Sequence, residues 1–116
     1  MTLDFLALKP FADTAEIKEI VRAFAACETA PQDFHHREHL AVALFYCVSY
    51  PPAEATARMC LGLQKFLTHH GLTQGYDEAL TLLWLRRVND FIGQASPSDD
   101  LPALANALLV IMNYEL

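Results

Sequence analysis

The chain has 116 residues, of which 53% are hydrophobic and 19% charged, and its formal net charge is −6. This length suits one domain with a single hydrophobic core. Only eight Lys and Arg residues are present, and clustered basic side chains are what bind phosphate backbones and anionic lipids, so nucleic acid and membrane surfaces are poor candidate partners.

The N-terminal stretch MTLDFLALKPFAD has no basic leader, and Asp4 and Lys9 interrupt its apolar residues. It does not have the pattern of a signal peptide, and no run approaches the roughly 18–20 apolar residues of a membrane span. We therefore expect a cytoplasmic protein. Cys27, Cys47 and Cys60 lack CxxC spacing, which is typical of small apolar residues in a reduced core. The mean hydropathy of +0.19 predicts an apolar surface covered in a homo-oligomer, most simply a homodimer.

Helix signals begin at Asp13 and Glu16, which have the spacing of a capping box and precede a predicted helix over 14–27. Asp33 is placed to cap a second helix over 34–50, and Pro51 follows that helix. An alanine-rich stretch predicts a third helix over 52–70, which Gly71 would end.

A fourth helix is expected over 77–92, with an apolar side that includes Leu80, Leu83 and Val88. Asp99 or Asp100 would cap a fifth helix over 101–116, whose apolar residues cover nearly all its faces. Such a helix is expected in the centre of the core or in an oligomer interface. No strand alternation is present, so the sequence predicts an all-α, single-domain helical bundle of about five helices over residues 1–116.

Short connections make sequential helices antiparallel neighbours. The second and fourth helices then start at the same end of the bundle, where the third helix finishes. This places Phe34, His36 and His39 beside residues from the end of the third helix and the start of the fourth: His69, His70, Tyr76, Asp77 and Glu78.

His36 and His39 are three residues apart, so they share one helix face. The positive end of the helix dipole disfavours imidazolium there and leaves a nitrogen lone pair available. With Glu78 or Asp77 as an oxygen ligand, the two histidines would form a two-His, one-carboxylate site for a divalent transition metal such as zinc, iron or manganese. Metal-assisted chemistry on a small molecule is the function that such a site would support.

Two further side chains are candidates for catalysis. Tyr76 can donate a hydrogen bond or a proton to a bound molecule, and Thr81 lies on the face of Glu78 and can orient it. Without a metal, His39 can act as a general base oriented by Glu78, or the pocket can simply bind a small-molecule ligand. A third alternative is a structural or interaction module that dimerises through the fifth helix, with the histidines only hydrogen-bonded at helix ends. These alternatives stay open.

Two segments resemble a family of small uncharacterised bacterial proteins with the motifs F-x-H-x-x-H-L and Y-H-E-T-x-T. The matching residues are Phe34, His36, His39 and Leu40 in the first motif, and Tyr76, Glu78 and Thr81 in the second. Asp77 and Ala79 stand where the family has histidine and threonine. The resemblance covers about residues 34–84 and implies a shared polar site without naming a reaction. If that histidine is a ligand in the relatives, Asp77 would have to replace it.

Overall fold

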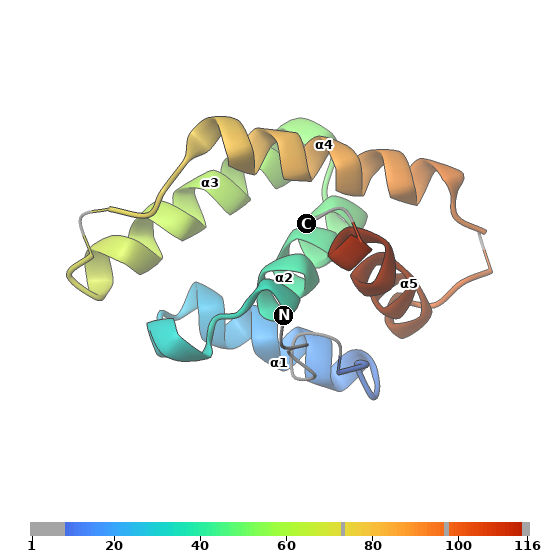
Figure 1. The fold of residues 1–116 in the computed structure, drawn as a ribbon, viewed down its shortest axis with the longest axis horizontal. Helices are drawn as coiled ribbons and strands as arrows, with labels where there is room; N and C mark the ends of the chain where they lie inside the picture. The colour runs from blue at the N-terminus through green and yellow to red at the C-terminus, as the bar shows by residue number, and fades with distance from the viewer. Residues whose placement is uncertain (1–8, 73, 97, 115–116) are drawn as a thin grey trace.

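The computed structural model describes residues 9–72, 74–96 and 98–114, which form five α-helices (Figure 1). In chain order these are α1 (Thr14–Ala25), α2 (His36–Ser49), α3 (Pro52–His69), α4 (Glu78–Gln94) and α5 (Leu101–Tyr114), with a 3-10 turn, η1 (Pro31–Asp33), before α2. No strand occurs in the described ranges. The predicted all-α bundle is therefore confirmed, and the described helix ends fall within two residues of the predicted ones.

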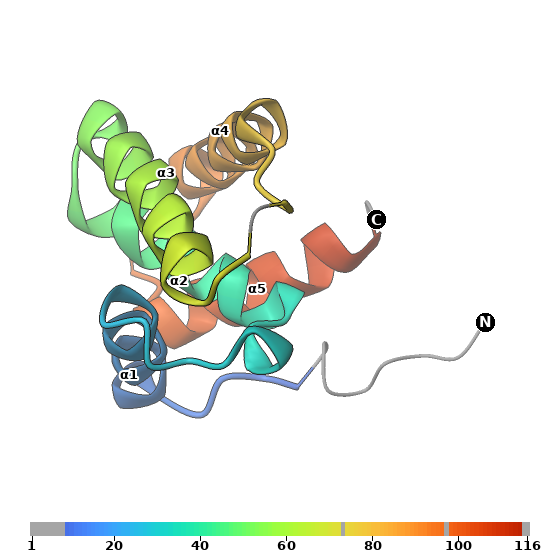
Figure 2. The same cartoon turned by 90° about the vertical axis from the view of Figure 1, so that its left-hand side faces the viewer.

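The central helix is α2, which lies against α1, α3, α4 and α5 (Figures 1 and 2). Its residues 40–44 are all buried, so in this stretch the helix is apolar on every side, as expected of a helix in the core. The alternative of a central fifth helix was therefore wrong. In α5 one face is buried through Leu108 and Leu109, whereas Val110 and Ile111 are exposed.

Aspartates begin three of the helices. Asp13 Oδ1 accepts a hydrogen bond from the Glu16 N–H at the start of α1, Asp77 caps α4 in the same way, and Asp100 accepts from the Ala103 N–H at the start of α5. Each bond satisfies an N–H that has no partner within its own helix. The choice left open between Asp99 and Asp100 is thus settled in favour of Asp100.

The start of α2 differs from the prediction. Asp33 was expected to cap this helix, but it lies in η1, and α2 begins only at His36. The Glu38 carboxylate accepts a hydrogen bond from the His35 N–H and caps the helix instead. The physical reason is Phe34, whose ring stacks on that of Phe24 at a centroid distance of 5.0 Å and draws the chain inward before the helix starts.

The inward face of α4 differs in part from the prediction, which correctly included Val88 but also placed Leu80 and Leu83 there. Leu80 and Leu83 are 48% and 47% exposed, whereas Thr81, Leu85 and Val88 are buried. The stretch LTLLWL offers apolar residues on several adjacent faces, so packing against α2 and α3 decides which face turns inward. This rotation places Thr81 on the interior side of the helix.

Arg37 is a buried cation that links residues 9–11 to α2. Its guanidinium donates hydrogen bonds to the Lys9 and Pro10 carbonyls and to the carboxylates of Glu16 and Glu38. It also lies 4.1 Å from the centre of the Phe11 ring, in a cation–π contact. Sequence patterning had no signal for this network, because its partners come from three separate segments.

All three cysteines are free and buried, as the spacing predicted. In the described part of the chain, none of the helices combines the length and apolar character needed to cross a membrane.

Candidate functional site

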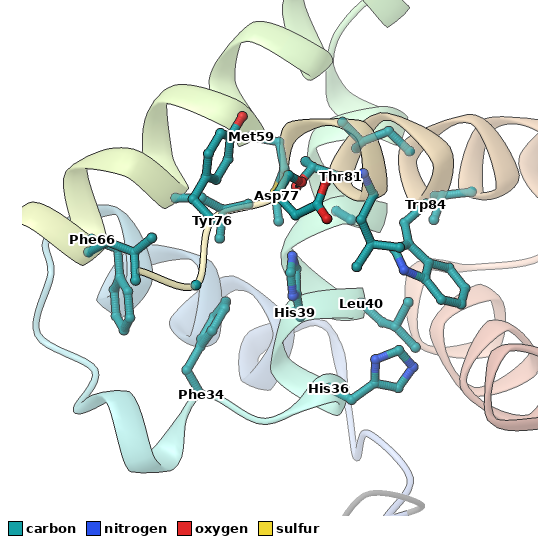
Figure 3. Close-up of a pocket in the computed structure, with 17 residues that line it drawn as sticks. Phe34, His36, His39, Leu40, Met59, Phe66, Tyr76, Asp77, Thr81 and Trp84 are labelled. Atoms are coloured by element: carbon teal, nitrogen blue, oxygen red, sulfur yellow. Dashed lines mark hydrogen bonds between the residues drawn. The ribbon is translucent and has the colours of Figure 1, made fainter. Parts of the chain in front are cut away.

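A cavity of about 380 Å³ lies between α2, α3 and α4 (Figure 3). Its lining is mostly apolar and aromatic, with a few polar groups. The lining residues are Phe34, His36, His39, Leu40, Ala43, Met59, Leu63, Phe66, Leu67, Gly75, Tyr76, Asp77, Leu80, Thr81, Trp84, Leu85 and Val88. Both segments that carry the sequence motifs therefore meet at one cavity, as the helix connections predicted.

Burial distinguishes the mouth of the cavity from its floor. Ala43, Met59 and Leu63 line it and are buried, so they form its floor. Gly75, Asp77 and Leu80 line it and are exposed. The mouth is therefore at the start of α4, where the loop from α3 reaches it.

The two histidines at the end of α3 lie outside the lining of this cavity. His69 and His70 were expected beside Tyr76, but neither lines the cavity. The His70 ring packs on Phe66 at 4.6 Å between centroids. Tyr76 instead lies near Gln64 and Leu67 of α3.

His39 reaches from α2 into the cavity, while His36 lies closer to Trp84 (Figure 3). The centroid of the His39 ring is 5.4 Å from that of Phe34, and the centroid of His36 is 5.9 Å from that of Trp84. Both histidines line the cavity from one helix face, as their spacing predicted, and His35 is exposed.

Both imidazoles are held in the neutral form at neutral pH. Burial lowers the pKa of His39 to about 4, with a further contribution from the neighbouring His36. Burial also lowers the pKa of His36. The physical cause is that an imidazolium loses its hydration in an apolar site. His36 Nε2 is out of contact with solvent and has no hydrogen-bond partner among the described residues.

Tyr76 lines the cavity with its ring, but its hydroxyl points toward α3 (Figure 3). Its oxygen is buried and, within the described ranges, has no well-aligned hydrogen-bond partner. The nearby Cys60 thiol, together with burial, raises the pKa of Tyr76. This orientation does not favour the predicted role of Tyr76 as a proton donor to a molecule in the cavity.

The carboxylates at the start of α4 have different positions. Asp77 lines the cavity, and its Oδ1 accepts a hydrogen bond from the Leu80 N–H at 2.9 Å. Glu78 is exposed and does not line the cavity. Thr81 was expected to orient Glu78, but its hydroxyl donates to the backbone carbonyl of Asp77 at 2.8 Å. Thr81 therefore holds the first turn of α4 in place.

The predicted metal ligands do not come together as a set. His36, His39 and Asp77 line the cavity and Glu78 lies outside it. Among the described residues, no group of three or more His, Cys, Asp or Glu side chains is close enough to hold a metal ion. The donors in this arrangement therefore do not fit a resident zinc, iron or manganese ion with three protein ligands.

Aromatic side chains are the part of the site that sequence reasoning missed. Phe66 and Trp84 were not among the predicted site residues, yet both line the cavity. Trp84 is only partly buried, and the Arg87 guanidinium carbon lies 5.5 Å from its ring centre. The spacing of Thr81, Trp84, Leu85 and Val88 along one helical face is the signal that could have identified this wall.

No protein-family model matches this chain, and no match was found among curated proteins or solved structures. The resemblance carried by the two motifs therefore stays a prediction.

Proposed function

We propose that this protein binds a small, largely apolar molecule in the cavity between α2, α3 and α4. One observation carries the proposal: a cavity of about 380 Å³ with an apolar floor and neutral imidazoles in its wall. Small-molecule sites typically have volumes of about 300–1,000 Å³, mainly hydrophobic walls and a few polar groups that orient the ligand.

The polar groups support ligand binding better than catalysis. An imidazole whose pKa is about 4 is neutral at pH 7 and can exchange hydrogen bonds with a ligand, but it is a weak general base. Glu78, the carboxylate expected to orient His39, does not line the cavity. His39 and His36 therefore act as hydrogen-bonding contacts in this proposal.

Binding can be measured through Trp84, the only tryptophan in the chain, which lies in the cavity wall. We would titrate the protein with 4-phenylbutan-1-ol, 4-phenylbutylamine and 4-phenylbutanoate, which share one apolar body, and follow tryptophan fluorescence and heat of binding. We expect saturable binding of at least one of them. Absence of binding for all three would contradict the proposed function.

A cavity-filling variant would locate the binding site. Ala43 is buried in the floor of the cavity, so Ala43→Phe should fill it and abolish binding, and Ala43→Leu should weaken binding with less overpacking. Ala57→Phe makes the same change at an exposed position of α3 outside the cavity and should leave binding unchanged. Equal binding by Ala43→Phe and Ala57→Phe would place the ligand elsewhere.

A second candidate function is self-association through α5. Ala103, Ala107, Val110 and Ile111 are exposed, and they form an apolar stripe along one face of the helix. We propose that this stripe forms the interface of a homodimer, which would shield it from water. Ile111→Glu should then produce a monomer in analytical ultracentrifugation, whereas Leu61→Glu on the exposed side of α3 should not. A monomeric unmodified protein would contradict this candidate.

For the compartment we propose the cytoplasm. Three free, buried cysteines are the state that reducing compartments maintain. Fractionation of cells that contain the labelled protein would show whether it is in the cytoplasmic fraction.

A further inference from the structure

The charges around the cavity indicate which ligand charge it accepts. This inference rests on the proposed function. Among the residues that the structure describes, no Lys or Arg lines the cavity, and Asp77 is the one carboxylate in its lining. Both histidines are neutral at pH 7 because burial lowers their pKa. The wall therefore carries a single formal charge, which is negative.

The aromatic side chains add to this negative character. Phe34, Phe66 and Trp84 line the cavity, and the centroids of Phe34 and Phe66 are 5.2 Å apart. The face of an aromatic ring attracts cations through its quadrupole, most strongly for tryptophan. The chain as a whole also has a net charge of −6, which attracts cations over longer distances.

Asp77 lies where a charged group could remain partly hydrated. It is exposed at the mouth of the cavity, and its Oδ1 accepts one hydrogen bond, from the Leu80 N–H. Its second oxygen can therefore accept from a ligand. An ammonium at this position would keep some of its water, while an attached apolar body could extend over the buried floor.

An anionic ligand would find no matching cation in the described lining of the cavity. Arg37 is adjacent to His36 in sequence, but its guanidinium is bound to Glu16, Glu38 and two backbone carbonyls. Arg87 contacts Trp84 but does not line the cavity. A carboxylate or phosphate entering the cavity would lose its hydration without gaining an ion pair there.

We propose that the cavity selects an organic cation, a protonated amine whose ammonium group lies against Asp77 and whose apolar body lies among Phe66, Trp84 and the buried floor.

The three phenylbutyl compounds test this selectivity because they share the phenyl ring and alkyl chain and differ in a terminal group that is cationic, neutral or anionic. At pH 7 we expect the amine to bind about tenfold more tightly than the alcohol, which is the scale of one partly exposed ion pair with added cation–π attraction. We expect 4-phenylbutanoate to bind most weakly. Added salt should weaken binding of the amine and leave binding of the alcohol almost unchanged.

Asp77→Asn is the decisive variant. Asparagine is as good an N-cap as aspartate, so α4 should keep its start while the cavity loses its charge. Affinity for the amine should fall severalfold toward that of the alcohol, because the ion pair is lost while the cation–π contacts remain, and affinity for the alcohol should stay unchanged. Glu78→Gln removes a charge from the next residue, which is exposed and outside the cavity, and should change neither affinity by more than about twofold.

The outcomes separate the two proposals. Equal affinities for amine and alcohol, or equal losses in Asp77→Asn and Glu78→Gln, would overturn the selection of a cation and leave the apolar binding site intact. Absence of binding for all three compounds would overturn the proposed function itself. If Asp77→Asn proved unfolded by circular dichroism, Asp77→Ser would serve, because serine also caps a helix without charge.

Discussion

Two neighbouring residues in the first turn of α2 have opposite surroundings. Arg37 is buried and donates hydrogen bonds to two carbonyls and two carboxylates. His36 has a buried Nε2 with no hydrogen-bond partner in the described part of the chain. Because nearly all buried polar groups in folded proteins have partners, the first arrangement is a completed structural network and the second indicates a place where a ligand can bind.

The network around Arg37 also affects the titration of its partners. Burial raises the pKa of Glu16, but the Ala12 N–H and the Arg37 guanidinium outweigh this effect, and the pKa is lower than usual. Around the cavity burial dominates, and it lowers the pKa of His39 without a compensating charge. The two sides of α2 therefore differ in whether a buried polar group is compensated from within the chain.

The largest expected effect on stability comes from removing the guanidinium of Arg37 from its hydrogen-bond network. Arg37→Ala would leave Glu16 and Glu38 without their cation, and we expect the free energy of unfolding to fall by about 3–5 kcal/mol. Urea unfolding measures this. The exposed Arg22, which pairs with Glu19 and Glu28, provides the control, and Arg22→Ala should cost about 1 kcal/mol or less.

If Arg37→Ala does not fold, Arg37→Lys keeps the charge but cannot reproduce the forked hydrogen bonds. Arg37→Lys should therefore have a clearly lower free energy of unfolding than Arg22→Lys. Equal stabilities for the Arg37 and Arg22 variants would contradict the structural role of the network.

The stability of the protein should depend on pH because the buried imidazole of His39 has no compensating charge. The pKa of His39 falls from 6.5 to about 4 on folding, so the unfolded chain binds a proton between these values and the folded protein does not. Stability is then fully present above pH 6.5 and declines as the pH falls, by about 2 kcal/mol between pH 7 and pH 5. Urea unfolding at several pH values measures the slope.

His39→Gln should reduce this slope, because glutamine does not titrate and only the smaller contribution of His36 remains. His35→Gln, on the exposed side of the same turn, should retain it. An unchanged slope in His39→Gln would show that the imidazole of His39 is not the group responsible.

A smaller effect is expected at His36. Replacing it with leucine removes a buried nitrogen that has no partner in the described structure, so stability should stay unchanged or rise by up to about 1 kcal/mol. Thermal and urea unfolding measure this. A loss of more than about 2 kcal/mol would mean that His36 has a structural role like that of Arg37.

The smallest effect is expected from chelation. Binding of 4-phenylbutylamine should be unchanged after exhaustive treatment with EDTA, because the described donors do not assemble into a three-ligand set. Elemental analysis of the protein and of His36→Ala/His39→Ala complements the titration. Loss of binding on chelation, restored by zinc, iron or manganese, would instead support the metal-site hypothesis with His36 and His39 as ligands.

The amino-acid sequence by itself determined the helices, because helix starts and stops depend on residues a few positions apart. Asp13, Asp77 and Asp100 cap helices through N–H groups three residues later, and Gly71 adopts a positive φ of 71° after α3. The short connections also indicated correctly that the starts of α2 and α4 meet.

Only the tertiary structure decided what those helix starts surround. Helical spacing does not indicate that Arg37 is enclosed by hydrogen-bond partners while His36 faces the cavity. It also places Glu78 as close to the histidines as Asp77. The packing angle and rotation of α4 against α2 turned Asp77, Thr81 and Trp84 toward the cavity and left Glu78 and Leu83 outside it. Such rotations depend on contacts between residues tens of positions apart, and a local sequence pattern carries no information about them.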